Sequence, residues 1–196
     1  MKQIETAFGP VTMRKPTEKE VLAKMQKRLN VETGRYPIDA LDDGDEEVLD
    51  CVTAPDRAQV EEWLEDAPRL IEPLEAAFDE LAGGAENVVP ADRGELPPEV
   101  LEKQRRVIAV RHGGQLLGLT RIGRVEFKLI KRNRDYMTGV AQLGRGHLVH
   151  GTIDATTWPS LAAQLGTHLL QLASKAVEGD VGKSPSSSAA TPPPKS

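Results

Sequence analysis

The sequence predicts an α+β fold in which short β-hairpins pack with helices, and helix is the commoner element. Three observations predict this class. Strand-like segments meet at glycine turns, apolar residues recur at helical spacing in longer segments, and the order hairpin, helix, loop, helix occurs in each half of the chain. A chain of 196 residues fits one medium domain or two small ones.

The first predicted elements are an N-terminal hairpin and an amphipathic helix. Segments 2–7 and 11–14 flank a Gly-Pro turn, which is typical of a hairpin. Thr17 and Glu20 then form a capping-box pattern, and apolar side chains follow at helical spacing. We therefore expect a helix over residues 18–29.

The rest of the first half alternates chain breakers with helices. Residues 30–45 are polar and contain Gly, Pro and Asp breakers, which predict a loop. A short helix over 46–52 follows, and another starts after Asp56. Pro68 is well placed to open a further helix, which Gly83 would end.

The second half begins with a predicted linker and a second hairpin. Residues 85–98 are rich in small, acidic and proline residues, as linkers often are. A short helix over 99–104 leads into a hairpin of segments 107–110 and 116–120, which flank a Gly-Gly turn.

The last segments combine helices with glycine-rich and proline-rich stretches. The sequence predicts a helix over 123–134, a glycine-rich loop over 139–146 and a long helix over 157–177. The Ser/Pro-rich residues from 179 onward predict a disordered tail. The residues that the helix over 123–134 should bury are Val125, Phe127, Leu129 and Ile130.

The net charge of −5 is distributed unevenly along the chain. Up to Gly94 there are 11 basic and 22 acidic side chains, and after it there are 14 and 8. This asymmetry favours two units with different electrostatic roles, although two halves that neutralise each other in one body would also explain it. The predicted organisation is an acidic domain 1–84, a linker 85–98, a basic domain 99–178 and a tail 179–196.

The repeated order of elements suggests a diverged tandem duplication. In this interpretation "KEVLAKMQKRL" corresponds to "RVEFKLIKRNR", and "CVTAPDRAQVEEWL" corresponds to "GTIDATTWPSLAAQL". The match needs gaps and shares few identities. A coincidence of two common patterns is the alternative.

Few residue patterns point to catalysis or to a cofactor. Cys51 is the only cysteine, so an intrachain disulfide is excluded, and acidic neighbours disfavour its thiolate. His147 and His150 form an HxxH pair with few carboxylates nearby. The carboxylates from Asp39 to Asp50 lack the calcium-loop spacing and predict a solvated loop. No phosphate-binding loop, dinucleotide fingerprint or nucleophile elbow occurs, so we expect no enzyme activity and no cofactor.

The chain also lacks the sequence features of membrane insertion or secretion. No stretch approaches the roughly 20 apolar residues of a membrane span, and the N-terminus has no apolar signal core. We therefore expect a cytoplasmic location.

A dense group of basic residues lies in the second half. Such a group can bind phosphates, although it can equally form a solvated helix face or dock on the acidic half. Aromatic residues are sparse around it, which disfavours stacking on single-stranded nucleic acid. The candidate basic patch comprises Arg105, Arg106, Arg121, Arg124, Lys128, Lys131, Arg132 and Arg134.

Two segments of the N-terminal half form a recognisable pattern, "GPVTMRKPTEKEVLAKM" and "VLDCVTAPDRAQVEEWLEDAPRLIEPLEAAFDELAG". Through them, about residues 5–84 resemble small tail assembly chaperones of long-tailed phages and prophages. This resemblance implies a non-enzymatic protein of the host cytoplasm, without cofactor, that binds a tape-measure protein and tail-tube subunits. The matching residues are Arg14, Pro16, Thr17, Cys51, Val52, Pro55, Asp56, Leu64, Pro68, Leu81 and Gly83.

A chaperone of this kind needs a partly exposed apolar groove to shield an apolar-striped helical partner. The candidate groove residues are Trp63, Leu64, Ile71, Leu74 and Phe78, and ordinary core packing is the alternative for each. Two competing functions stay open. One is a structural component of the virion or baseplate, and the other is a nucleic-acid-binding accessory protein that uses the basic half.

Overall fold

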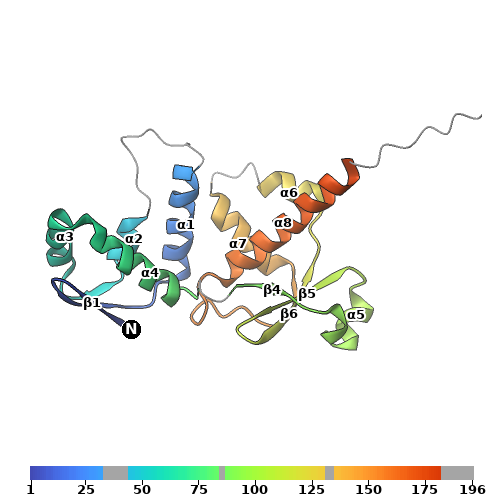
Figure 1. Ribbon diagram of the computed structural model, residues 1–196. Helices are drawn as coiled ribbons and strands as arrows, with labels where there is room; N and C mark the ends of the chain where they lie inside the picture. The colour runs from blue at the N-terminus through green and yellow to red at the C-terminus, as the bar shows by residue number, and fades with distance from the viewer. Residues whose placement is uncertain (33–43, 84–86, 131–134, 182–196) are drawn as a thin grey trace, which may run out of the picture.

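The computed structural model describes residues 1–32, 44–83, 87–130 and 135–181, and it confirms the predicted α+β class. We call residues 1–83 the first unit and residues 87–181 the second unit. In the described chain each unit combines helices with one small antiparallel sheet (Figure 1). The elements of the first unit are β1 (Lys2–Thr6), β2 (Gly9–Met13), α1 (Glu18–Glu32), α2 (Asp45–Leu49), β3 (Val52–Ala54), α3 (Arg57–Asp66), η2 (Pro68–Leu70) and α4 (Ile71–Leu81). Those of the second unit are β4 (Val89–Pro90), η3 (Arg93–Glu95), α5 (Pro98–Lys103), β5 (Val107–His112), β6 (Gln115–Thr120), α6 (Arg124–Ile130), α7 (Tyr136–Gly146), β7 (Leu148–His150) and α8 (Leu161–Val181).

The predicted first hairpin forms and carries an additional strand, but its turn is Ala7–Phe8 and not the predicted Gly-Pro pair, because Gly9 pairs with Thr6 and begins β2. β1 and β2 pair antiparallel, and the hydroxyl of Thr6 closes the turn by donating to the carbonyl of Gly9 at 2.6 Å. β3 pairs with the other edge of β2. The predicted helix over 46–52 therefore ends early, at Leu49, and Val52 begins a strand instead.

Helix α1 begins at the predicted capping box. The backbone N–H of Thr17 donates to the Glu20 carboxylate at 2.7 Å, and the N–H of Glu20 donates to the Thr17 hydroxyl at 3.4 Å. These bonds satisfy N–H groups that the first helical turn leaves without partners. The helix extends to Glu32, into the predicted loop over 30–45, and residues 33–43 of that loop lie outside the described residues.

The segment from α3 to α4 follows its proline and glycine signals. The Asp56 carboxylate caps α3 by accepting the Gln59 N–H at 2.9 Å. Pro68 opens the short 3-10 helix η2, from which α4 continues to Leu81. Beyond α4, Gly83 has a φ of 79°, a backbone conformation that residues with a side chain rarely adopt.

The segment predicted as a linker takes part in the second unit. Val89 and Pro90 form β4, which pairs with β5 at the edge of the sheet, a position that tolerates proline. Asp92 and Glu95 form a reciprocal capping box around η3. Leu96 is buried against the sheet, so this acidic, proline-containing segment also supplies core.

The second sheet is built around the predicted hairpin of β5 and β6. Its strands run in the order β4-β5-β6-β7. Gly113 and Gly114 both have positive φ angles, of 54° and 77°, as a two-residue hairpin turn of type I′ requires. β7 adds to β6 just as β3 adds to β2, and for its three residues the sequence pattern does not distinguish strand from loop.

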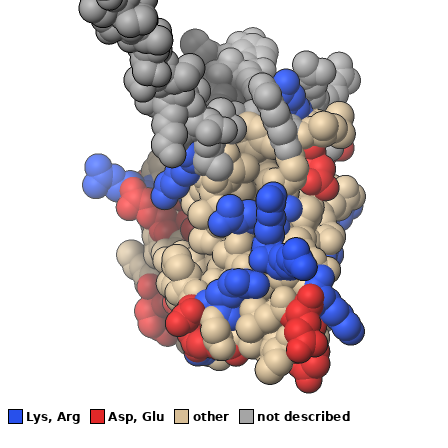
Figure 2. All heavy atoms as spheres, turned by 90° about the vertical axis from the view of Figure 1, so that its right-hand side faces the viewer, with Lys and Arg blue, Asp and Glu red and all other residues tan. Residues whose placement is uncertain are grey.

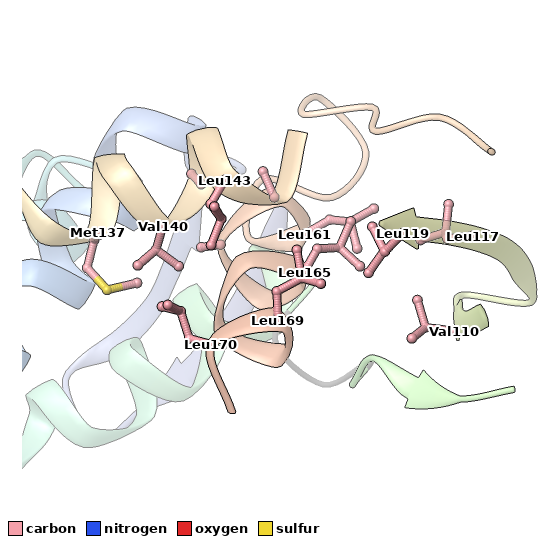
Figure 3. Close-up of a cluster of buried hydrophobic side chains, with 13 residues drawn as sticks. Val110, Leu117, Leu119, Met137, Val140, Leu143, Leu161, Leu165, Leu169 and Leu170 are labelled. Atoms are coloured by element: carbon pink, nitrogen blue, oxygen red, sulfur yellow. The ribbon is translucent and has the colours of Figure 1, made fainter. Parts of the chain in front are cut away.

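The prediction of a glycine-rich loop over 139–146 is wrong, because this segment is the helix α7. Its glycines permit close packing on α8. A side chain at Gly144 would overlap the backbone of Ala162, and one at Gly166 would overlap the backbone of Val140. Figure 3 shows α8 leucines between α7 on one side and β6 on the other. Tertiary packing thus overrides the low helix propensity of glycine.

Helix α8 begins and ends four residues later than predicted. It starts at Leu161, after a turn in which Asp154 accepts hydrogen bonds from Thr156 and Thr157, and it continues to Val181. Residues 179–181 of the predicted tail are therefore helical, and residues 182–196 lie outside the described residues.

The two units pack together, and α1 joins their cores. Met25 contacts both hydrophobic clusters, while Leu22 and Leu29 pack against the cluster of the second unit. The N–H of Met137 at the start of α7 donates to the Gln26 side chain at 2.9 Å. The pairing of Arg145 with Glu18 adds an ion pair across the junction, which places α1 beside α7 (Figure 1).

Candidate binding surface

Apart from Met1 at the N-terminus, the two most exposed large apolar side chains of the described chain both belong to helix α6. Val125 is 71% exposed and Leu129 is 62% exposed. They are four residues apart, so they lie on the same face of the helix. Phe127 and Ile130 occupy the opposite face and pack partly against the second core. The prediction that all four are buried is wrong for Val125 and Leu129.

The exposed face of α6 borders an open groove against α7. The groove has a volume of about 350 Å³, and it lies beside Leu129. Apolar and small residues contribute much of its wall, with one carboxylate and one imidazole at the edge. The lining residues are Glu126, Leu129, Ile130, Gly139, Gln142, Leu143, Gly146 and His147.

A second groove lies on the other side of α7, against α1 of the first unit. Its volume is about 500 Å³, and Gln142 lines both grooves. Arg145 and Glu18, which pair across the junction of the units, are among its lining residues. The outer face of α7 is therefore bordered on both sides by hollows, and α6 and α1 form their outer walls.

His147 fixes α6 to the end of the second sheet. Its Nδ1 lies 2.8 Å from the hydroxyl of Thr120, and its Nε2 lies 3.3 Å from the carboxylate of Glu126. The same carboxylate accepts the N–H of Gly123 at 2.7 Å and so caps α6. Both ring nitrogens of His147 have protein partners, which leaves neither to ligate a metal in this arrangement.

The two histidines of the HxxH pair have separate structural positions. His147 caps the C-terminus of α7, whereas His150 lies in β7, opposite Gly118 of β6. Within the residues that the structure describes, no group of three or more His, Cys, Asp or Glu side chains is arranged to hold a metal ion.

Of the five groove residues predicted on α3 and α4, two are buried in the first core and three are half-buried. Leu74 and Phe78 are at most 1% exposed and belong to the first core, so they are unavailable to a partner. Trp63, Leu64 and Ile71 are half-buried against the same core. The periodicity that suggested a binding stripe is thus mainly the core-facing stripe of α4.

An aromatic pair remains at the surface of the first unit. Phe8, at the tip of the first hairpin, stacks on Trp63 with ring centroids 5.6 Å apart and planes inclined by 17°. Such stacking stabilises the hairpin against α3. Trp63 is consequently held by an intramolecular contact.

Half of the candidate basic patch can be placed. Four of its side chains are exposed on the second unit: Arg105, Arg106, Arg121 and Lys128. Lys131, Arg132 and Arg134 lie outside the described residues, as does the side chain of Arg124. Figure 2 shows Lys and Arg side chains gathered on the face of the molecule that lies at the right of Figure 1.

The acidic run and the cysteine have structural surroundings. Glu46 and Asp50 pair with Arg57, and Glu47 pairs with Lys27, so part of the run predicted to be a solvated loop is ion-paired. Residues 39–43 of that run lie outside the described residues. Cys51 is buried, as expected for core, and burial raises the pKa of its thiol to about 11, which disfavours the thiolate.

Comparisons of the chain with protein-family models, with curated proteins and with solved structures found no match. In the part of the chain that the structure describes, no helix combines the length and the apolar character needed to cross a membrane.

Proposed function

We propose that this protein acts by binding, as a phage or prophage tail assembly chaperone that shields an apolar-striped helix of a tape-measure protein. The observation that carries the proposal is the exposed pair Val125 and Leu129 beside the groove between α6 and α7. An amphipathic helix can lay its apolar face into such a groove, which is a common mode of peptide recognition. Release to tail-tube subunits would complete the role.

The motif residues that carry the resemblance have structural roles in the first unit. The Arg14 guanidinium bonds the Glu20 carboxylate and, at 3.0 Å, the carbonyl of Asp50, which ties the hairpin to α1 and α2. Thr17 caps α1 and Asp56 caps α3. Each of these residues shapes the first unit, whereas the exposed apolar pair lies in the second unit.

Co-expression with a tape-measure protein from the same genome tests the proposal. We expect the tagged full-length chain to capture that protein and to increase its soluble fraction. The double variant Val125→Ser, Leu129→Ser should lose capture, because it removes the exposed apolar contact. Val89→Ser is the matched control, since Val89 is 47% exposed but lies on the edge strand β4.

Two outcomes would contradict the proposal. One is the absence of both a complex and a gain in solubility with the wild-type chain. The other is recovery of the chain in finished particles, which would favour a structural component of the virion or baseplate. Capture that survives the α6 double variant would refute the assigned surface.

A further inference from the structure

The cations of the described chain differ in their electrostatic surroundings. Ion pairs between cations and carboxylates occur in the first unit, in the second unit and across their junction. These paired cations have their charge balanced within the fold. They are Lys2, Arg14, Lys24, Lys27, Arg57, Arg111 and Arg145.

Four exposed arginines of the second unit have no ion pair to a carboxylate within residues 1–32, 44–83, 87–130 and 135–181. One is Arg93 in η3, and the other three are Arg105, Arg106 and Arg121, which we call the arginine trio. The last register pair of the second hairpin is Val107 opposite Thr120. Arg106 immediately precedes this pair and Arg121 immediately follows it, so the trio gathers at the open end of the hairpin.

The same end of the hairpin adjoins the exposed apolar residues of α6. Thr120 contacts His147, and His147 in turn contacts Glu126 of α6. Arg121 is separated from the start of α6 by Ile122 and Gly123. An uncompensated positive cluster and an exposed apolar pair are thus neighbours on one part of the second unit.

Building on the proposed function, we propose that this combined surface docks a partner helix whose apolar stripe is flanked by Asp or Glu residues. The apolar stripe contacts Val125 and Leu129, and the flanking carboxylates meet the arginine trio and Lys128. Complementary charge of this kind directs the orientation and speeds the encounter more than it adds affinity.

The charge pattern argues against two other occupants. The chain's own residues 182–196 contain two lysines, no acidic side chain and no large apolar side chain. A second copy would bring like charges together, because this surface exposes the arginine trio and Lys128. A two-fold contact between identical patches would oppose those cations to each other.

Two synthetic helical peptides provide the test, with the full-length chain as receptor. Both carry the same leucine stripe, and one has Glu and the other Lys at the flanking positions. Fluorescence anisotropy should show the Glu peptide binding about tenfold more tightly at low salt, as a few exposed ion pairs would give. The preference should shrink as salt rises, because exposed charges are screened.

Matched variants separate the two parts of the surface. Arg105→Gln, Arg106→Gln, Arg121→Gln should abolish the preference for the Glu peptide. A control with the same change in net charge, Arg28→Gln, Arg69→Gln, Arg93→Gln, replaces exposed arginines elsewhere and should retain it. The Val125→Ser, Leu129→Ser variant should weaken binding of both peptides.

Three results would overturn the inference. The first is that the trio variant and its control discriminate equally between the Glu and Lys peptides. The second is that the wild-type chain does not bind the Glu peptide. The third is that a single-stranded DNA oligonucleotide binds through the trio while neither peptide binds. The last result would assign the trio to nucleic acid. If the wild-type chain captures the tape-measure protein but shows no preference between the two peptides, this inference alone is refuted. Peptide discrimination by the wild-type chain without capture would refute the proposed function.

Discussion

The two units share an order of elements but differ in how the helix after each hairpin is packed. In each unit a hairpin is followed by helix, and a later three-residue strand pairs with the second hairpin strand. In the first unit the helix after the hairpin, α1, contacts both cores. In the second unit the corresponding helix, α6, presents Val125 and Leu129 to solvent.

The two helices therefore differ in how much of their apolar surface the fold buries. The helix of the first unit is capped and buried on two sides, which suits a structural role. Helix α6 of the second unit is short. Its apolar residues lie on two faces, and one of these faces packs against the second core. The shared order agrees with the predicted duplication, whose sequence relationship stays a prediction.

The largest expected effect concerns the core of the first unit. Phe78→Ala should lower the free energy of unfolding by about 3–5 kcal/mol, because a fully buried ring leaves a cavity. Trp63→Ala should cost less, since Trp63 is half-buried. Urea denaturation of the full chain measures both, and an equal loss for the two variants would show that Trp63 is as well packed as Phe78.

A smaller effect is expected where α7 and α8 approach most closely. Gly144→Ala should destabilise the fold by about 1–3 kcal/mol, because the added methyl group overlaps backbone atoms of α8. Gly146→Ala meets nothing within 4 Å and is the matched control. Thermal unfolding should rank the two variants in this order, and a stabilising Gly144→Ala would contradict the close approach.

The capping box of α1 should give the first unit a dependence on pH. Hydrogen bonds from Arg14 lower the pKa of Glu20 from 4.5 to about 2. The ionised carboxylate therefore contributes stability above pH 4.5, and this contribution is lost as the pH falls towards 2. Glu20→Gln should lose about 1 kcal/mol at neutral pH, and its stability should converge with that of the wild type in acid. A constant difference across this range would point to another carboxylate.

The smallest effect should be on the stability of the second unit. Val125→Ser, Leu129→Ser should change the free energy of unfolding by no more than about 0.5 kcal/mol, because both side chains are exposed. Val21→Ser, in the buried face of α1, is the contrasting variant and should destabilise the chain clearly. A large loss in the α6 variant would mean that these residues are packed in solution.

The sequence predicted the fold class and several element boundaries because the interactions that set them are local. The capping box at Thr17, the paired glycines of the second turn and the Asp56 cap each act within a few residues. By contrast β3 and β7 depend on a distant partner strand, and three residues carry too little periodicity to reveal it.

The candidate surface was harder to predict from the sequence. In the sequence, the glycines of α7 are typical of a loop. In the structure they are needed because the backbone of α8 packs so close to α7 that it leaves no room for a side chain at Gly144. Val125 and Leu129 share a helix with Phe127 and Ile130, so sequence alone shows apolar residues on two faces and does not decide which face packs. The opposite error occurred at α4, where Leu74 and Phe78 were predicted to line a binding groove but lie in the core.

The position of α1 between the two cores couples the packing of the two units. Loss of the second unit would uncover Leu22, Met25 and Leu29, and loss of α1 would remove the packing partner of both clusters at once. Native-state fluctuations that detach α1 therefore approach complete unfolding, so its amide protons should be among the slowest to exchange in the first unit.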